Sequence, residues 1–181
     1  TEWVANGGGF IGINQPSARD GYDTYFRMSH ILGVDEDIGK KIYHGKFSFE
    51  LEDEKIIPDG VKINPKKNIY LTSADTKVYM ADCGVPTLTV YNFEKGKGIY
   101  LSEFRTNNKN NRMLLDLILL AAGEEIQQNC MTDNAEVECC YYPNSKSVVV
   151  INNSEEMQDT RISLFESVLE VLLLPLETKI L

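Results

Sequence analysis

The chain has 181 residues, a formal net charge of -9, 43% hydrophobic and 25% charged residues, and a mean hydropathy of -0.25. This length allows one large domain or two small ones. The acidic balance argues against a nucleic-acid partner, which would need a basic face, and no apolar run is long enough to span a bilayer. Basic pairs at 40–41 and 66–67 lie among acidic residues, so we interpret them as solvated surface.

The cysteines and histidines do not form a metal-binding or disulfide pattern. The sequence lacks a C-x-x-C motif and has two histidines, so we expect no zinc site. Cys139 and Cys140 would point to opposite faces of a strand, which argues against a disulfide scaffold. We therefore expect reduced cysteines and a cytoplasmic protein. The cysteines are Cys83, Cys130, Cys139 and Cys140, and the histidines are His30 and His44.

The chain opens on a short apolar segment followed by three consecutive glycines. Residues 1–6 predict the last turn of a helix, with Trp3 and Val4 facing a core. The apolar run 10–13 predicts an interior strand that is covered on both faces. We interpret Gly7–Gly9 as a tight connection between this helix and this strand. A start inside an element indicates a part of a larger protein.

The glycines also match the spacing of a dinucleotide-binding loop. Gly7, Gly9 and Gly12 fit G-x-G-x-x-G. That motif lies between a strand and a following helix, however, whereas these glycines follow a helix and precede a strand. We therefore expect no dinucleotide site. A lesser alternative is a loop that lets the backbone approach a neighbouring domain.

The middle of the chain mixes helices and short strands. A helix from Asp23 or Thr24 to Leu32 is expected to end at Gly33. A second helix is predicted at 111–122, where apolar residues on nearly every side indicate burial between layers or under another domain, and Gly123 should end it. Strands are predicted at 46–51, 56–63 (with a turn at 58–60), 68–71, 78–81, 87–93 and 99–104, the last two joined by a hairpin turn at 94–98.

The composition changes near residues 127–134. Four strand-like runs follow with turn residues and no helix between them, which is typical of an antiparallel β module. We place the domain boundary at 130/131. The runs are 136–142, 147–152, 160–165 and 168–174.

No residue pattern in the chain amounts to an active site. Cys83 lacks a nucleophile-elbow motif, and no motif links His30 or His44 to it. Carboxylate pairs are abundant, but their spacing alone does not nominate two that would flank a glycosidic bond. We therefore predict no catalytic residue.

The opening segment resembles a known enzyme family. Residues 3–13 read W-V-A-N-G-G-G-F-I-G-I, followed by Q-P-S-A at 15–18, Y-F at 25–26 and L-G-V-D at 32–35. This combination is similar to that of the 1,3-β-galactosyl-N-acetylhexosamine (lacto-N-biose/galacto-N-biose) phosphorylase family, which includes β-1,4-galactosyl-L-rhamnose phosphorylases. Weaker matches extend the resemblance along the chain, at 68–70, 96–100, 111–112, 114–115, 149–153 and 174–177.

The resemblance implies reversible phosphorolysis, in which orthophosphate attacks a β-galactoside with inversion and gives α-galactose 1-phosphate. It implies a TIM-like catalytic barrel, then an α/β domain of the class I glutamine amidotransferase or β-galactosidase trimerisation type, then a C-terminal β domain. Residues 1–130 would be the second half of the α/β domain and 131–181 the small antiparallel β domain. The barrel, which in this family carries the general acid and most sugar and phosphate contacts, is the expected partner, together with further copies in a homo-oligomer.

The resemblance also indicates where this chain would meet the barrel or substrate. Functional loops of α/β sheets lie at the carboxyl ends of strands, so residues 14–19 are the first candidate and the glycine turn is the second. The sequence has Asn14-Gln15 where the family commonly has Gly-Glu, so any role of that acid would not carry over. We expect positioning rather than proton transfer from Asn6, Gly7, Gly8, Gly9, Asn14, Gln15, Pro16, Ser17 and Arg19.

The expected function is therefore that of a non-catalytic C-terminal portion of a β-galactoside phosphorylase, inactive alone. No metal or cofactor is expected, with orthophosphate as a substrate of the parent enzyme. A second hypothesis is an oligomerisation or binding module of another carbohydrate-active enzyme, in which helix 111–122 packs on another subunit. A third is an amidotransferase-like hydrolase that uses Cys83.

Overall fold

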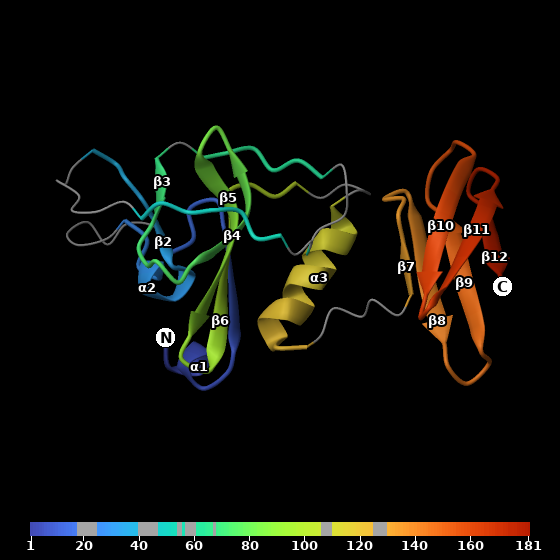
Figure 1. Cartoon of the computed structure of the whole chain (residues 1–181), viewed down its shortest axis with the longest axis horizontal. Helices are drawn as coiled ribbons and strands as arrows, with labels where there is room; N and C mark the ends of the chain where they lie inside the picture. The colour runs from blue at the N-terminus through green and yellow to red at the C-terminus, as the bar shows by residue number, and fades with distance from the viewer. Residues whose placement is uncertain are drawn as a thin grey trace. The chain divides into compact units, whose positions relative to one another are not determined.

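The computed structural model describes residues 1–17, 25–39, 47–53, 56, 61–66, 68–105, 110–124 and 130–181. These residues form two compact units, which we describe separately. The first contains most of the described chain up to residue 124. The second contains residues 130–181 together with Val61 and residues 110–113. Both are built mainly from β-sheets, with few helices (Figure 1).

The first unit is organised around a four-stranded mixed sheet with the order β1-β6-β5-β4. β1 runs parallel to β6, whereas the other two pairs are antiparallel. A separate two-stranded antiparallel sheet is formed by β2 and β3. The elements are α1 (Glu2–Ala5), β1 (Gly9–Ile13), α2 (Ser29–Leu32), β2 (Val34–Glu36), β3 (Ile69–Leu71), β4 (Lys77–Asp82), β5 (Val85–Phe93), β6 (Gly96–Leu101) and α3 (Asn111–Ala122), of which residues 114–122 belong to this unit.

The hydrophobic core of the first unit joins the four-stranded sheet to the β2–β3 sheet. Tyr100 of β6 and Val78 of β4 are buried in it with residues of α2, β2 and β3. The ring centroids of Tyr100 and Phe26 lie 5.9 Å apart. Burial of these apolar side chains is the main force that holds the two sheets together. The cluster consists of Phe26, Leu32, Val34, Ile69, Leu71, Val78 and Tyr100.

The helix α3 has the bounds that the sequence predicts, and Gly123 follows it with a φ of 80°. Met113 and Leu117 are fully buried, but Leu115 and Ile118 are about half exposed, at 47% and 48%. The helix is therefore amphipathic within the described structure, although its sequence is apolar nearly all round. No helix among the described residues is both long and apolar enough to cross a membrane.

The second unit contains two three-stranded antiparallel sheets, ordered β11-β10-β7 and β12-β9-β8. Buried residues of both sheets share one core, to which Val150, Ile162 and Leu173 contribute fully buried side chains. This arrangement matches the antiparallel β module predicted from the turn spacing. The strands are β7 (Cys130–Thr132), β8 (Val137–Tyr142), β9 (Ser147–Asn152), β10 (Gln158–Leu164), β11 (Ser167–Leu173) and β12 (Thr178–Ile180).

Several predictions near the N-terminus are wrong. Trp3 is 68% exposed, whereas Val4 is buried as predicted. Within the described sheet β1 is an edge strand rather than an interior one, and its Ile13 is 38% exposed. The helix that ends at Gly33 begins at Ser29, and residues 25–28 before it are not helical. The predicted start at Asp23 or Thr24 lies outside the described residues, and the N–H groups of Tyr25 and Phe26 bond to the side chain of Asp35.

The strands and turns predicted for the middle of the chain agree only in part with the structure. Residues 47–50 form no strand, and Leu51 makes a single bridge to Val78. The segment 56–63 is not a strand at its described positions, and its predicted turn at 58–60 lies outside the described residues. The hairpin between β5 and β6 is confirmed with a shorter turn, Glu94-Lys95, in which Glu94 has a φ of 53°.

Candidate functional site

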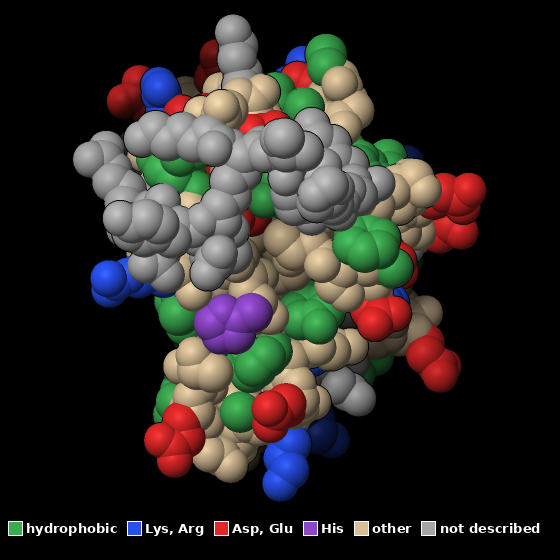
Figure 2. Space-filling view, turned by 90° about the vertical axis from the view of Figure 1, so that its left-hand side faces the viewer, with side chains coloured by type: hydrophobic (Ala, Val, Ile, Leu, Met, Phe, Trp, Pro, Cys, Tyr) green, Lys and Arg blue, Asp and Glu red, His purple; other side chains and the backbone are tan. Residues whose placement is uncertain are grey.

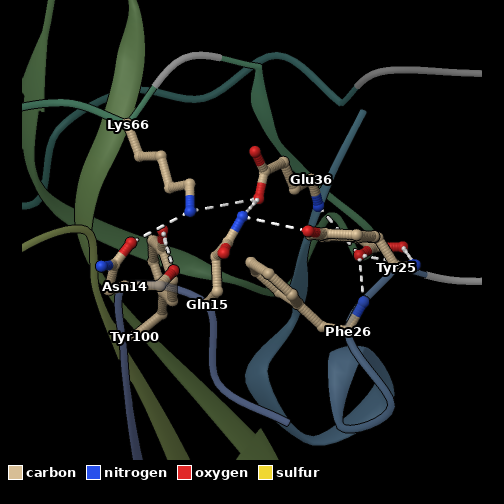
Figure 3. Close-up of polar contacts among 8 residues, drawn as sticks. Asn14, Gln15, Tyr25, Phe26, Glu36, Lys66 and Tyr100 are labelled. Carbon is tan, nitrogen blue, oxygen red and sulfur yellow. Dashed lines mark hydrogen bonds and ion pairs between the residues drawn. The ribbon is translucent and has the colours of Figure 1, made fainter. Parts of the chain in front are cut away.

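A network of polar residues gathers where β1 ends. We call Asn14, Gln15, Tyr25, Asp35, Glu36 and Lys66 the β1-edge cluster (Figure 3). Asn14 follows the last residue of β1 and has a φ of 63°. Asparagine tolerates this left-handed conformation better than most residues. The cluster therefore sits where the chain turns away from the sheet.

Both backbone polar groups of Asn14 bond to residues of β6. Its N–H donates to the carbonyl of Leu101 at 2.8 Å, and its carbonyl accepts from the Tyr100 hydroxyl at 3.2 Å. Burial, with a smaller effect of the Glu36 carboxylate, raises the pKa of Tyr100 well above its usual range. The phenol is protonated at neutral pH, as tyrosine ordinarily is, and the raised pKa keeps it a hydrogen-bond donor at alkaline pH as well.

Gln15 links the end of β1 to β2 and to the segment before α2. Its Nε2 donates to the Tyr25 hydroxyl at 3.0 Å and to Glu36 Oε2 at 3.2 Å. Residues from three separate parts of the chain therefore meet at one amide group, as Figure 3 shows.

Lys66 completes the network opposite Glu36. Its Nζ donates to Asn14 Oδ1 at 3.0 Å and lies 3.4 Å from Glu36 Oε2. The side chains of Lys66 and Glu36 are only 20% and 12% exposed. Water screens such a pair less than it screens an ion pair on an open surface, so this contact restrains Asn14 and Glu36 together.

The buried carboxylate of Asp35 accepts hydrogen bonds from several residues of the cluster and its surroundings. The residue is 1% exposed, and its carboxylate accepts from the N–H groups of Tyr25 (3.0 Å), Phe26 (2.8 Å) and Glu36 (2.8 Å) and from the Tyr70 hydroxyl (3.2 Å). A buried carboxylate is stable only with such partners. Asp35 thereby fixes the backbone of the two residues whose side chains hold Gln15.

The structure brings together some of the residues predicted for a contact site but not others. Asn14 and Gln15 belong to the cluster. Pro16 is buried, and Ser17, with a φ of 48°, accepts from the N–H of Arg27 at 3.2 Å. Arg19 lies outside the described residues. The remaining predicted residues, Asn6, Gly7, Gly8 and Gly9, lie before and at the start of β1, at its opposite end.

The glycine turn connects α1 to β1, as predicted. Gly7 has a φ of 110°, and the N–H groups of Gly7 and Gly8 donate to carbonyls of α1. A side chain on Gly9 would overlap the backbone carbonyl of Ala121 in α3. The glycines therefore allow close packing within the first unit, and their N–H groups at 7 and 8 are already bonded.

Cys83 and His30 do not form a catalytic pair. Cys83 lies in the tight turn between β4 and β5, and the neighbouring Asp82 carboxylate, through a hydrogen bond and its charge, raises the pKa of the thiol. A reactive cysteine needs the opposite shift. His30 is exposed, bonds to Thr1 Oγ1 at 3.2 Å, and its ring lies edge-to-face with that of Phe93. Figure 2 shows a histidine side chain on the surface of this face of the molecule.

Two family models match almost the whole chain. The lacto-N-biose phosphorylase central domain matches residues 1–126, and the lacto-N-biose phosphorylase C-terminal domain matches residues 131–181. The chain belongs to the lacto-N-biose phosphorylase family. The resemblance seen in the sequence is thereby confirmed.

Galactoside phosphorylases are similar to this protein over most of its length. It is 44% identical over 167 residues to a D-galactosyl-β-1→4-L-rhamnose phosphorylase of Lachnoclostridium phytofermentans, covering 91% of this chain and 23% of that protein. It is 33% identical over 165 residues to a 1,3-β-galactosyl-N-acetylhexosamine phosphorylase of the same organism, covering 88% and 23%. The chain thus spans about a quarter of the length of these relatives.

Among solved structures, a β-galactosidase from Rahnella sp. R3 is similar at 14% sequence identity and a TM-score of 0.47, and the alignment covers 99% of this chain and 29% of that enzyme. For a β-galactosidase from Bacillus circulans sp. alkalophilus the identity is 15% and the TM-score 0.42, and the alignment again covers 99% of this chain and 29% of the enzyme.

Sequence reasoning does not identify four members of the site, Tyr25, Asp35, Glu36 and Lys66. Tyr25 and Asp35 lie in the Y-F and L-G-V-D matches, which assign them no role, and the charges around Lys66 indicate solvated surface. No local pattern identifies Glu36 and Lys66, which meet only because β2 and the segment before β3 lie side by side at the end of β1. An aspartate directly after a short apolar run, at residues 31–34, is the sequence signal that points to Asp35.

Among the described residues, no group of three or more His, Cys, Asp or Glu side chains is placed to hold a metal ion.

Proposed function

We propose that this chain is a non-catalytic supporting portion of a β-galactoside phosphorylase of the glycosyltransferase type. The parent enzyme would catalyse reversible, inverting phosphorolysis that gives α-galactose 1-phosphate, with orthophosphate and the galactoside bound mainly by a catalytic barrel outside residues 1–181. The match of the central and C-terminal domain models along the chain is the observation that carries this proposal.

The chemistry of the β1-edge cluster favours support over catalysis. Proton transfer in phosphorolysis needs an acid that can reach the glycosidic oxygen. The carboxylate of Asp35 is buried and bonded to four donors, and Oε2 of Glu36 contacts Gln15 and Lys66. The cluster is built to hold a loop in place. We therefore propose that residues 14–17 face the catalytic barrel or its bound substrate.

The domain type of the first unit and the cellular compartment are part of the same proposal. The first unit would be the second half of an amidotransferase-like or trimerisation-type α/β domain, in a cytoplasmic enzyme. The half-exposed Leu115 and Ile118 on α3 favour a second role, in homo-oligomer formation. Light scattering of the parent enzyme at several concentrations tests this role, and a concentration-independent monomer would contradict it.

The supporting role can be tested by exchange into a relative. In the L. phytofermentans galactosyl-rhamnose phosphorylase, the segment matching this chain is replaced by residues 1–181. Because the two segments are 44% identical, we expect the hybrid to release phosphate from α-galactose 1-phosphate and L-rhamnose with a kcat/KM within about tenfold of the parent, a barrier change near 1.4 kcal/mol.

Two controls make the exchange decisive. The relative without the segment and residues 1–181 alone should both show no phosphate release above background. A folded hybrid that is no more active than the deletion variant would contradict the supporting role. Turnover by residues 1–181 alone would contradict the non-catalytic assignment.

A further inference from the structure

The two amides at the end of β1 are held in opposite orientations by charged partners. Lys66 carries only donors, so the atom of Asn14 that faces it at 3.0 Å must be the carbonyl oxygen Oδ1. The Asn14 side chain is exposed, and its Nδ2 has no hydrogen-bond partner within the described part of the chain. Asn14 therefore presents a hydrogen-bond donor.

Gln15 presents the complementary group. The Glu36 carboxylate accepts hydrogen bonds, so the Gln15 atom at 3.2 Å from it must be Nε2, and the same nitrogen contacts the Tyr25 hydroxyl. The carbonyl oxygen Oε1 of this exposed residue has no partner among the residues that the structure describes. Adjacent residues thus offer one oriented donor and one oriented acceptor (Figure 3).

The charges around these two amides do not favour an anion, because the cluster contains one lysine, Lys66, and two carboxylates, Glu36 and the buried Asp35. Lys66 and Glu36 form an ion pair at 3.4 Å, so the cluster offers no excess positive charge to a phosphate group. A hydroxyl group, by contrast, is a donor and an acceptor at once. The arrangement therefore suits a neutral ligand with neighbouring hydroxyls better than an anion.

We propose that Asn14 and Gln15 form a hydrogen-bonding subsite for a hydroxylated sugar, with Asn14 Nδ2 donating and Gln15 Oε1 accepting. Lys66 and Glu36 orient the two amides, and Asp35 holds Tyr25 and Glu36 in place behind them. This subsite deepens the proposed function and rests on it, because a galactoside phosphorylase binds two sugar units. The hydroxyls could belong to the galactosyl unit or to the acceptor sugar.

The test is a titration of the ¹⁵N-labelled chain followed by NMR. D-Galactose, L-rhamnose and N-acetylglucosamine are added separately up to about 100 mM, because a site with few contacts is expected to bind in the millimolar range. We expect the side-chain amide signals of Asn14 and Gln15 to shift and saturate with at least one sugar. The sugar that saturates them at the lowest concentration identifies the source of the hydroxyls. Sodium phosphate at equal ionic strength should cause no saturable shift.

Variants separate the subsite from general solvent effects. Asn14→Leu and Gln15→Leu should each weaken sugar binding at least tenfold, which is about 1.4 kcal/mol. Lys66→Met, which leaves both amides in place but removes the group that orients Asn14, should also weaken it. Asn92→Leu is the matched control, because Asn92 is exposed on β5 at the other end of the sheet. Backbone spectra confirm that each variant is folded.

Absence of a saturable shift with all three sugars would overturn the subsite, as would saturation by phosphate or an equal loss in Asn92→Leu. These outcomes are distinct from failure of the supporting role. A hybrid enzyme that is active while the chain binds no sugar would refute the subsite alone, and residues 14–17 would then contact protein groups of the barrel. An inactive, folded hybrid refutes the supporting role whatever the titration gives.

Discussion

Replacing Asp35 with asparagine is expected to lower the free energy of unfolding of the first unit by about 3 kcal/mol. The carboxylate is 1% exposed and accepts from the N–H groups of Tyr25, Phe26 and Glu36 and from the Tyr70 hydroxyl. An asparagine of the same size has one acceptor oxygen and an NH₂ group that would face a donor. At least one buried donor would therefore lose its partner.

Amide hydrogen exchange measures this effect locally. The N–H groups of Tyr25, Phe26 and Glu36 should exchange at least about tenfold faster in Asp35→Asn, since local opening would cost less free energy. The matched control is Asp75→Asn, because Asp75 is exposed, and it should change stability by less than about 0.5 kcal/mol. Equal exchange rates in the two variants would show that Asp35 does not organise the cluster.

Gly98→Ala is expected to destabilise the first unit by about 2–3 kcal/mol. Gly98 lies in β6 beneath α2, and a β-carbon there would overlap the carbonyl oxygen of Ile31 and crowd the Cα of Leu32. These are backbone atoms, so the helix itself would have to move. Alanine normally suits a strand interior better than glycine, so the sign of this effect comes from the close approach of the helix.

Urea unfolding of Gly98→Ala and of Lys97→Ala compares the two faces of β6. Lys97 is the neighbouring residue on the same strand, is only partly buried and should tolerate alanine with little loss. A Gly98→Ala variant as stable as the parent chain would mean that α2 does not lie directly on the strand. If only Gly98→Ala loses stability, we also expect the position of Phe26 to change, because Phe26 shares the hydrophobic core with Leu32 of α2.

The elements that were predicted well are those fixed by local signals. The helix 111–122 has a continuous apolar sequence and a glycine with positive φ directly after it. The strands of the second unit alternate between inward and outward residues and are separated by turn residues such as Asn153 and Ser154. The side chain of Asn152, which is buried, fixes one of these turns by bonding to Ser154, Glu156 and Leu174. β7 and β12 were missed because strands of three residues carry too short an alternation.

The errors come from tertiary contacts that override local preference. The sequence from Tyr25 has helical spacing, but residues 25–28 are not helical. Long-range contacts place them instead: Tyr25 and Phe26 bond to Asp35, and Phe26 is buried beside Tyr100. For the candidate site, the position of Asn14 and Gln15 followed from the rule that strand ends carry functional loops. Their partners could not be predicted, since Glu36 and Lys66 reach the site through the arrangement of strands and not through any sequence spacing.

The most direct test of the central claim is the kcat/KM for phosphate release by the hybrid enzyme carrying Gln15→Leu, measured beside the hybrid carrying Asn92→Leu. We expect the Gln15 variant to lose at least about tenfold, a barrier increase near 1.4 kcal/mol, because the loop at the end of β1 loses its bonds to Tyr25 and Glu36 and its acceptor. The Asn92 variant should match the hybrid. Equal kcat/KM values for the two variants would contradict the claim that this chain supports catalysis through the β1-edge cluster.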